Sequence, residues 1–499
     1  MRLKKMTVSL LAAAMAVTTL AGCGAMPSTG NADGNGASEN TGVASKEEEK
    51  TGGQITLQVV DWSDGSAAQR EEFHKKFEET HPNIKIEYTM LTVDQFKNTI
   101  VTMIKSGEGP DLFPIPVGLT LDTAVEEGWF QPINDYVTDD FREKFDPAAF
   151  AEGVTDIGDE WYTVTEQMPI IQCLFFYNKS ILEQAGVNEI PKTYSEFREA
   201  CKKVTEMGNG NIYGLIDGGK QMNRMDVMAR SLAAAAGGKV AATQKVLTDN
   251  GVAPYDSKEM NEALGLIKGL VDDGSIHPDT INVSAPEARE LFAQGQAAFL
   301  CQGMWCVSQW DANYPDLKYG VMAVPVPDGV TNTYVQAGEL SPWMGIYKQS
   351  KHPKEAAEYL MALYDEQYGY QQSNVESGSF VSCIPEINEK YMTNEHMKEY
   401  YTIAEETSRV VPTLVKRDEK ANDFYAEVKD VQPSLGAIVQ GIISQSLTDY
   451  SSALKILADD TTTEWKRASE AVGMDYSSLE FPNWDVTKDY TDADYAALK

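Results

Sequence analysis

Apolar and polar residues alternate at the start of the folded part of the chain and then recur at helical spacing. The alternation over residues 55–59 predicts a strand with one buried face. Ser66 and Gln69 have the spacing of a capping box, and the apolar residues beyond them fall on one side of a helix. The pattern therefore predicts a strand, a loop over 61–65 and a helix that begins near Ser66.

The next elements repeat this order. A second strand is predicted over 84–88, and Thr92 with Gln95 opens a second helix. A third short strand follows over 109–113. The order of strand, helix, strand, helix and strand predicts a parallel sheet with right-handed crossovers. Ligands of such open sheets bind at the carboxyl ends of the strands, where the loop over 61–65 is expected to lie.

A second α/β unit is expected to begin with the apolar stretch 170–177. The helix that follows has core positions at Phe197, Cys201 and Val204. Arg224 stands in a polar loop after a strand over 212–216 and is expected to be solvated. Further predicted elements are a helix over 286–293, a strand over 297–300, a helix start over 304–310, a strand over 319–326, an amphipathic helix over 353–364 and mostly helical structure over 438–472.

The N-terminus has the pattern of a bacterial secretion signal. A basic start precedes an apolar run from Val8 to Leu20, which is too short for an ordinary membrane-spanning helix. Two small residues stand directly before Cys23, as in a lipoprotein cleavage box. We therefore expect a signal peptide over 1–22 and a diacylglycerol on the sulfur of Cys23; the alternative is a plain signal peptide with an incidental cysteine. Residues 24–53 have the composition of a disordered tether.

Charge and cysteine content narrow the class of protein. The chain has 42 basic and 75 acidic residues, a net charge of −33, and removal of the signal peptide makes it −36 because three basic residues leave. Such a charge argues against nucleic-acid partners. Beyond Cys23 the cysteines are odd in number and irregularly spaced, which predicts buried free thiols. The sequence leaves open whether Cys301 and Cys306 pair. We expect no metal and no cofactor.

Four passages follow one another along the chain: Gly109-Pro110-Asp111-Leu112-Phe113, Phe176-Tyr177-Asn178-Lys179, Phe292 to Phe299 with Gly303 and Trp305 after it, and Tyr319-Gly320-Val321 through Pro325. In sequence and in order they resemble the extracellular solute-binding protein family 1, the maltose-binding-protein-like sugar receptors of ABC importers. The resemblance implies an α/β, two-lobed periplasmic-binding-protein-like fold of type II. Each lobe would be a sheet flanked by helices, with a hinge between the lobes and the ligand held between them.

The resemblance also implies that each lobe is discontinuous, because the chain would cross between the lobes near residues 169, 338 and 377. The expected parts are a signal peptide over 1–22, the lipidated cysteine and tether over 23–53, an N-terminal lobe over 54–169 and 339–377, and a C-terminal lobe over 170–338 and 378–499.

A sugar receptor needs carboxylates and amides for hydroxyl groups and aromatic plates for the C–H faces. Seven residues of these types fall in loops expected to face the other lobe. The candidate ligand-binding residues are Trp62, Asp64, Asp111, Glu166, Trp305, Glu339 and Trp343.

Each candidate has a structural alternative. Trp305, chosen from its position in the family, is either a plate for the sugar or a core residue. Asp64 could cap the helix that starts near Ser66, and Asp111 could be a turn residue after Pro110. Glu339 and Trp343 flank the second crossing and could serve lobe packing, while Glu166 lies in the first crossing.

The sequence argues against an enzyme. None of the five histidines has metal-ligand spacing, and no Gly-x-Ser-x-Gly elbow occurs. We expect the substrate-binding lipoprotein of an ABC importer, a monomer on the outer face of the cell membrane that binds a carbohydrate and contacts the transmembrane permease subunits. The alternatives are a secreted glycoside hydrolase, which would need two paired carboxylates, and a receptor for a non-sugar polar solute on the same fold.

Overall fold

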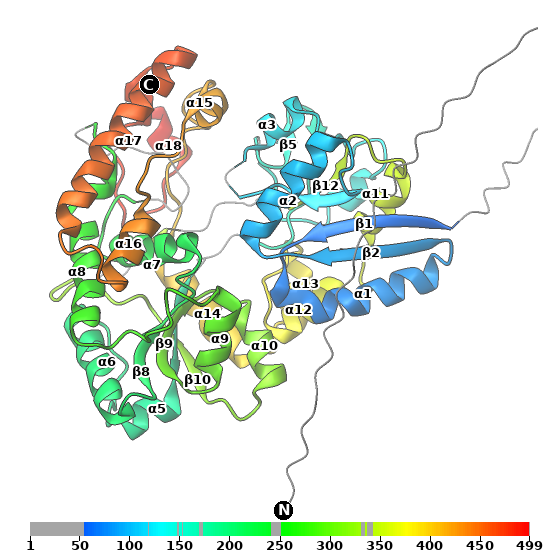
Figure 1. Ribbon diagram of the computed structural model, residues 1–499. Helices are drawn as coiled ribbons and strands as arrows, with labels where there is room; N and C mark the ends of the chain where they lie inside the picture. The colour runs from blue at the N-terminus through cyan, green and yellow to red at the C-terminus, as the bar shows by residue number, and fades with distance from the viewer. Residues whose placement is uncertain are drawn as a thin grey trace, which may run out of the picture. The chain divides into compact units, whose positions relative to one another are not determined.

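The computed structural model describes residues 54–498 except 118, 147–148, 152, 169–172, 241–250, 331–334 and 337–342. These residues belong to one compact unit, Gly53–Lys499, in which helices and strands are interspersed (Figure 1). Cys23, the tether and the crossings expected near 169 and 338 lie outside the described residues.

The first sheet has the strand order β2-β1-β3-β12-β4. Its first three strands, β1 (Ile55–Asp61), β2 (Ile84–Met90) and β3 (Leu112–Pro114), are parallel, as the sequence predicts. A strand from much later in the chain, β12 (Met344–Tyr347), joins them antiparallel and also pairs with β4 (Phe130–Gln131). We call this sheet and the helices packed on it the first lobe.

Some helices of the first lobe begin where the sequence predicts. Thr92 and Gln95 form the complete capping box of α2 (Val93–Ser106). The capping box expected at Ser66 is wrong: Ser66 precedes α1 (Ala67–Thr80) but makes no side-chain cap bond, and the Gln69 amide donates to Ser377 Oγ at 2.8 Å. A 3-10 turn at Asp64–Ser66 leads into α1 instead. The other helices are α3 (Leu121–Glu126), α4 (Asp139–Arg142), α11 (Pro353–Ala362) and α12 (Tyr370–Ser377).

The second sheet has the order β10-β7-β9-β8 and mixes both strand directions. β9 (Ala297–Gln302) is parallel to β8 (Tyr213–Ile216) and antiparallel to β7 (Leu174–Asn178). Every residue of β7 and β9 is buried, so apolar side chains cover both faces of these strands. The strand expected over 319–326 is shorter, since β10 spans Tyr319–Met322.

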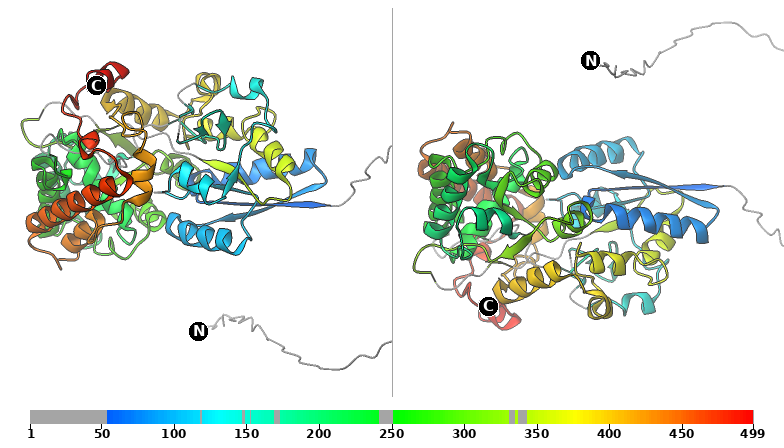
Figure 2. Two further views of the ribbon diagram at one scale, coloured as in Figure 1. Left: turned by 90° about the horizontal axis from the view of Figure 1, so that it is seen from above. Right: turned by 90° about the horizontal axis from the view of Figure 1, so that it is seen from below.

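Helices lie on both sides of the second sheet, and this sheet with its helices is the second lobe (Figures 1 and 2). Ser284 and Glu287 form the complete capping box of α9, which begins within a residue of the predicted helix over 286–293. The helices are α5 (Lys179–Gln184), α6 (Tyr194–Gly208), α7 (Met222–Ala235), α8 (Lys258–Asp272), α9 (Ala285–Ala293), α10 (Cys306–Asn313), α14 (Glu395–Thr407), α15 (Ala421–Glu427), α16 (Leu435–Ile443), α17 (Tyr450–Val472) and α18 (Asp492–Ala496). A further helix, α13 (Pro385–Tyr391), packs against α12 of the first lobe (Figure 1). Two further pairs, β5 (Asp156–Ile157) with β6 (Glu160–Trp161) and β11 (Val335–Gln336) with β13 (Ser408–Arg409), complete the strands.

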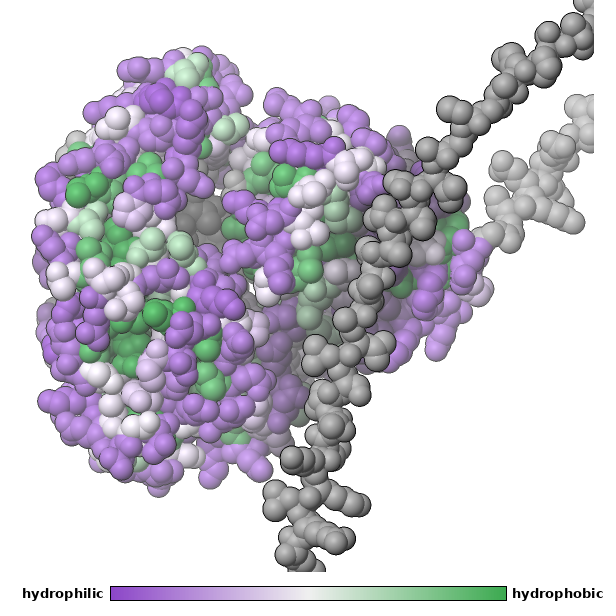
Figure 3. Space-filling view, viewed as in Figure 1, coloured by the Kyte–Doolittle hydropathy of each residue, from purple (hydrophilic) through white to green (hydrophobic). Residues whose placement is uncertain are grey.

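The surface and interior agree with the composition. The face shown in Figure 3 is mostly hydrophilic. Within the described part of the chain, all the cysteines are buried and free, so the predicted free thiols are confirmed and Cys301 and Cys306 are not paired. None of the helices described is long and apolar enough to cross a membrane.

Candidate functional site

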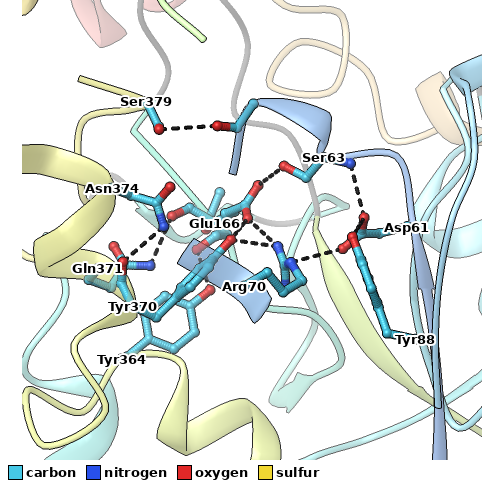
Figure 4. A network of polar contacts seen from close by, with 12 residues as sticks. Asp61, Ser63, Arg70, Tyr88, Glu166, Tyr364, Tyr370, Gln371, Asn374 and Ser379 are labelled. Atoms are coloured by element: carbon cyan, nitrogen blue, oxygen red, sulfur yellow. Dashed lines mark hydrogen bonds and ion pairs between the residues drawn. The ribbon is translucent and has the colours of Figure 1, made fainter. Parts of the chain in front are cut away.

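A buried arginine and its partners hold the loop that follows β1 in place. Arg70, on α1, has no exposed side-chain surface. Its Nη2 donates to Glu166 Oε1 and to the Tyr370 hydroxyl, both at 2.6 Å, and its Nε lies 3.3 Å from Asp61 Oδ2 (Figure 4). We call Asp61, Arg70, Glu166 and Tyr370 the Arg70 network. It joins the end of β1, the start of α1, the segment before residue 169 and the start of α12.

The Arg70 network holds the backbone of the loop directly. Asp61 Oδ1 accepts from Ser63 N at 2.9 Å and from the Tyr88 hydroxyl at 2.7 Å. Glu166 Oε2 accepts from Ser63 Oγ at 3.2 Å (Figure 4). Burial disfavours the charged guanidinium of Arg70, but Asp61, Tyr370 and Glu166 outweigh it and hold the pKa of Arg70 well above its usual value. The carboxyl groups that bind the loop are therefore paired with a permanently charged arginine.

Residues of the second lobe contact the same loop. Asp64 forms an ion pair with Arg289 of α9, and its carbonyl accepts from Gln309 Nε2 at 3.0 Å. The Gly65 carbonyl accepts from Ser308 Oγ at 3.0 Å. A Cβ at residue 65 would lie 2.8 Å from Trp305 Cβ, so only glycine permits this approach. Asp64 does not cap α1; the structure brings it to α9 and α10 instead.

Two of the predicted indoles lie against each other on the first lobe. The rings of Trp62 and Trp343 meet edge to face, with centroids 5.2 Å apart, and Phe96 packs on Trp62 at 4.7 Å. Trp62 is half-buried and Trp343 is buried. Arg70 Cζ stands 6.0 Å from the centre of the Trp343 ring. The aromatic pair thus joins the loop, through Trp62, to the surroundings of Arg70, through Trp343.

Trp305 is half-buried at the start of α10. Its Nε1 donates to Gln302 Oε1 at 3.3 Å. The six-membered ring lies over residue 303, where a Cβ would come within 2.2 Å of the ring carbon Cζ3. Glycine at 303 therefore permits this position of the indole.

Asp111 and Glu166 do not present free carboxylates at the end of β1, where the ligand was expected. Asp111 precedes β3 and lies beside Gln58, whose backbone N–H it accepts at 2.9 Å, and it also accepts from Ser350 Oγ at 2.6 Å. Because Leu112 pairs with Val59, Asp111 lies on the amino-terminal side of β3, away from the loop at the end of β1. Glu166 is buried with its carboxylate engaged by Arg70. Glu339 lies outside the described residues.

Sequence reasoning missed the arginines. The expectation that Arg224 is solvated is wrong: it is buried, and its Nη2 lies 3.5 Å from Asp217 Oδ2. Arg70 stands on the same helical face as the buried Phe73 and Phe77, and Arg289 is buried on α9. An arginine at a core position of a predicted helix is the signal that could have identified Arg70. The described residues contain no group of three or more side chains that could hold a metal ion.

Residues 61–370 match the family model of the bacterial extracellular solute-binding proteins. The match spans more than half of the chain, so the protein belongs to this family. Its members are solute-binding proteins, which makes this chain an extracytoplasmic binding protein and not an enzyme, and the predicted family is confirmed.

Individual relatives are distant in sequence. A putative binding protein of Brucella abortus is 25% identical over 63% of this chain and 73% of its own length. An arabinooligosaccharide-binding protein of Bacillus subtilis is 23% identical over 72% of this chain and 76% of its own.

Solved structures share the fold. The chain is similar to an ABC transporter solute-binding protein of Thermotoga lettingae bound with α-D-tagatose, with a TM-score of 0.64, 22% identity and coverage of 82% of this chain and 100% of that one. It is also similar to a maltose/maltodextrin-binding domain of Bdellovibrio bacteriovorus bound to maltotriose, with a TM-score of 0.61, 18% identity and coverage of 83% and 100%. The predicted two-lobed type II fold is confirmed.

Removal of the Arg70 guanidinium tests the Arg70 network. Arg70→Met leaves two carboxylates buried without their counter-charge, and we expect the free energy of unfolding to fall by about 3–5 kcal/mol. Arg142→Met is the matched control, because the Arg142 side chain is 39% exposed beside Asp156 and its loss should cost about 1 kcal/mol or less. Urea denaturation measures both; equal losses in the two variants would contradict the role given to Arg70.

His74, on the same helix as Arg70, gives the first lobe a pH-dependent stability. Burial, with Arg70 and Lys85 nearby, lowers the pKa of His74 to about 3. In the unfolded chain its pKa is about 6.5. Between these two pKa values His74 is protonated in the unfolded chain and neutral in the folded protein. The free energy of unfolding therefore falls as the pH falls from about 6.5 toward 3. Denaturation across this range should show a shallower fall in His74→Gln than in the wild type, and parallel curves would contradict the assignment.

Proposed function

We propose that the chain is the substrate-binding lipoprotein of an ABC importer, which captures an oligosaccharide between its lobes and delivers it to the permease. The observation that carries this proposal is the convergence of Trp62, Asp64 and Trp305. The loop after β1 meets the start of α10, where the Gly65 carbonyl accepts from Ser308. Indoles and a carboxylate from two separate α/β lobes thus occupy one region.

The chemistry of this region suits a sugar. Indole rings offer flat apolar surfaces to the C–H faces of a pyranose, and carboxylate, amide and guanidinium groups serve its hydroxyls. Trp62 and Trp305 are half-buried, so each exposes part of its ring, and the Asp64 side chain is 32% exposed. We take Trp62, Trp305 and Asp64 as ligand contacts, with Trp343 supporting Trp62 from behind.

Relatives support a carbohydrate as the solute class. One relative is named as an arabinooligosaccharide-binding protein, and structurally similar proteins were solved with α-D-tagatose and with maltotriose. These ligands differ in size and linkage, so they support the class and not one sugar.

Capture would follow from lobe closure. A ligand that contacts both lobes binds the closed form better than the open form and so shifts the population toward it. The closed form would be stabilised further by the ion pair of Asp64 with Arg289 and by the hydrogen bond from Gln309 to the Asp64 carbonyl. The permease would then recognise that form.

The lobe boundaries inferred from the family complete this picture. We propose that the first lobe comprises 54–169 and 339–377 and the second 170–338 and 378–499. Pairing of β12 with β3 supports the first assignment. The third crossing is the least sharp, because backbone carbonyls of Val381 and Cys383 still accept from Met168 and Asp146.

Attachment to the membrane would come through Cys23. The small residues before it and the basic, apolar N-terminus support cleavage and lipidation there. The polar segment over 24–53 would then tether the binding lobes to the outer face of the membrane.

Titration calorimetry with tagatose, maltotriose, xylotriose, stachyose and chitotriose tests the solute class. We expect saturable binding of one oligosaccharide per chain, and its recovery unchanged. Trp305→Ala should weaken that binding about tenfold, because loss of an aromatic ring stacked on the ligand costs about 1.4 kcal/mol. Tyr391→Ala, which removes a half-buried aromatic at the end of α13, is the control and should bind as the wild type does.

Two outcomes would redirect the proposal. If titration with a peptide or another polar solute gives a heat of binding and titration with each sugar gives none, the protein is a receptor for a non-sugar solute. Wild-type affinity in Trp305→Ala would remove Trp305 from the site.

Metabolic labelling with a fatty-acid analogue tests the anchor. The wild type should incorporate label and partition with membranes, whereas Cys23→Ala should be unlabelled, because the thioether cannot form. Cys383→Ala controls for labelling of other thiols. Equal label in the wild type and Cys23→Ala would contradict lipidation at this position.

A further inference from the structure

A second buried polar chain lies within the second lobe. Asp217 directly follows β8 and is 1% exposed. Arg224 of α7 places Nη2 3.5 Å from Asp217 Oδ2 and donates from the same nitrogen to the Cys301 carbonyl at 2.6 Å. The backbone N–H of Gly218 donates to Asp217 Oδ1 at 2.7 Å. Asp217 is therefore held as an acceptor at the carboxyl end of its strand.

Gln302 links this chain to the candidate plate. It is the last residue of β9 and has no exposed surface. Its Nε2 donates to Asp217 Oδ1 at 3.1 Å, and its Oε1 accepts from Trp305 Nε1 at 3.3 Å. Asp217 Oδ1 accepts from both the Gly218 N–H and the Gln302 amide, so Asp217 fixes that amide with its nitrogen inward. The carbonyl oxygen must then face the indole.

The indole is constrained from a second side. Its six-membered ring lies over Gly303, where a Cβ would come within 2.2 Å of it. A ring that rests on a backbone without a Cβ and donates its N–H to a fixed acceptor has few orientations left. All these partners belong to the second lobe.

We propose that Gln302 is a positioning residue that holds the Trp305 indole in its sugar-binding orientation before the ligand arrives. The inference rests on the proposed function of Trp305 as a plate. A ring already held in place loses less side-chain entropy on binding, which raises affinity. The alternative, that Gln302 only satisfies buried polar groups, makes no demand on Trp305.

The decisive experiment uses the full chain without ligand. Fluorine NMR of protein labelled with 5-fluorotryptophan reports each of the eight tryptophans, and Trp305→Phe identifies the Trp305 resonance. In Gln302→Met, a nearly isosteric change, we expect the Trp305 resonance to shift and broaden. Gln296→Met makes the same substitution at the turn before β9 and should leave it unchanged.

A conservative variant adds a rescue. In Gln302→Glu the new carboxyl lies beside Asp217 and is expected to be protonated, which leaves one O–H for Asp217 and one oxygen for the indole. The Trp305 resonance should return toward its wild-type position. An unchanged Trp305 resonance in folded Gln302→Met, or equal shifts in Gln302→Met and Gln302→Glu, would overturn the proposal.

Binding provides an independent arm. With the oligosaccharide that calorimetry identifies as the probe, Gln302→Met should bind about tenfold more weakly. In a Trp305→Phe background the same change should cost little, because phenylalanine has no N–H to orient. Full additivity would contradict positioning through the indole. If no sugar binds, the proposed function fails while the NMR arm still decides whether Gln302 holds Trp305.

Discussion

The buried guanidinium of Arg70 is the interaction on which the first lobe's edge depends. It lies on the first turn of α1 and reaches Glu166 and Tyr370, which are 96 and 300 residues away in sequence. Without its charge, the carboxyl groups of Asp61 and Glu166 would be buried without a counter-charge, which is costly. Because Asp61 and Glu166 also hold Ser63, the position of the loop that carries Trp62 and Asp64 follows from this one cation.

The second lobe contains a similar buried pair of an aspartate and an arginine. Each lobe has a buried aspartate at the carboxyl end of a strand, with Asp61 as the last residue of β1 and Asp217 directly after β8. Each aspartate pairs with an arginine from the helix that follows. Each pair lies beneath candidate ligand-binding aromatics. Rings that bind sugar faces must be partly exposed and still fixed, and apolar packing alone cannot hold a half-exposed ring. Buried hydrogen-bonded charges supply directional support that apolar packing lacks.

Local signals in the sequence predicted local structure well. The capping residues Thr92 and Gln95 mark a real helix start because their partners lie within the same turn. The capping box predicted at Ser66 does not form, because Gln69 instead makes a tertiary hydrogen bond to Ser377, far away in the sequence. Asp111 was expected at the ligand-binding edge, but it stands before its strand and not after it. The pairing of β12 with β3 and the partners of Arg70 depend on contacts across hundreds of residues, which no local pattern encodes.

Hydrogen exchange during ligand binding tests the central claim, that one oligosaccharide is held by both lobes at the loop after β1 and the start of α10. The account predicts that the bound sugar slows amide exchange in peptides covering 62–67 and 303–310 together, with no comparable change in α17. Protection of only one of the two peptides, or of a region away from both, would contradict it.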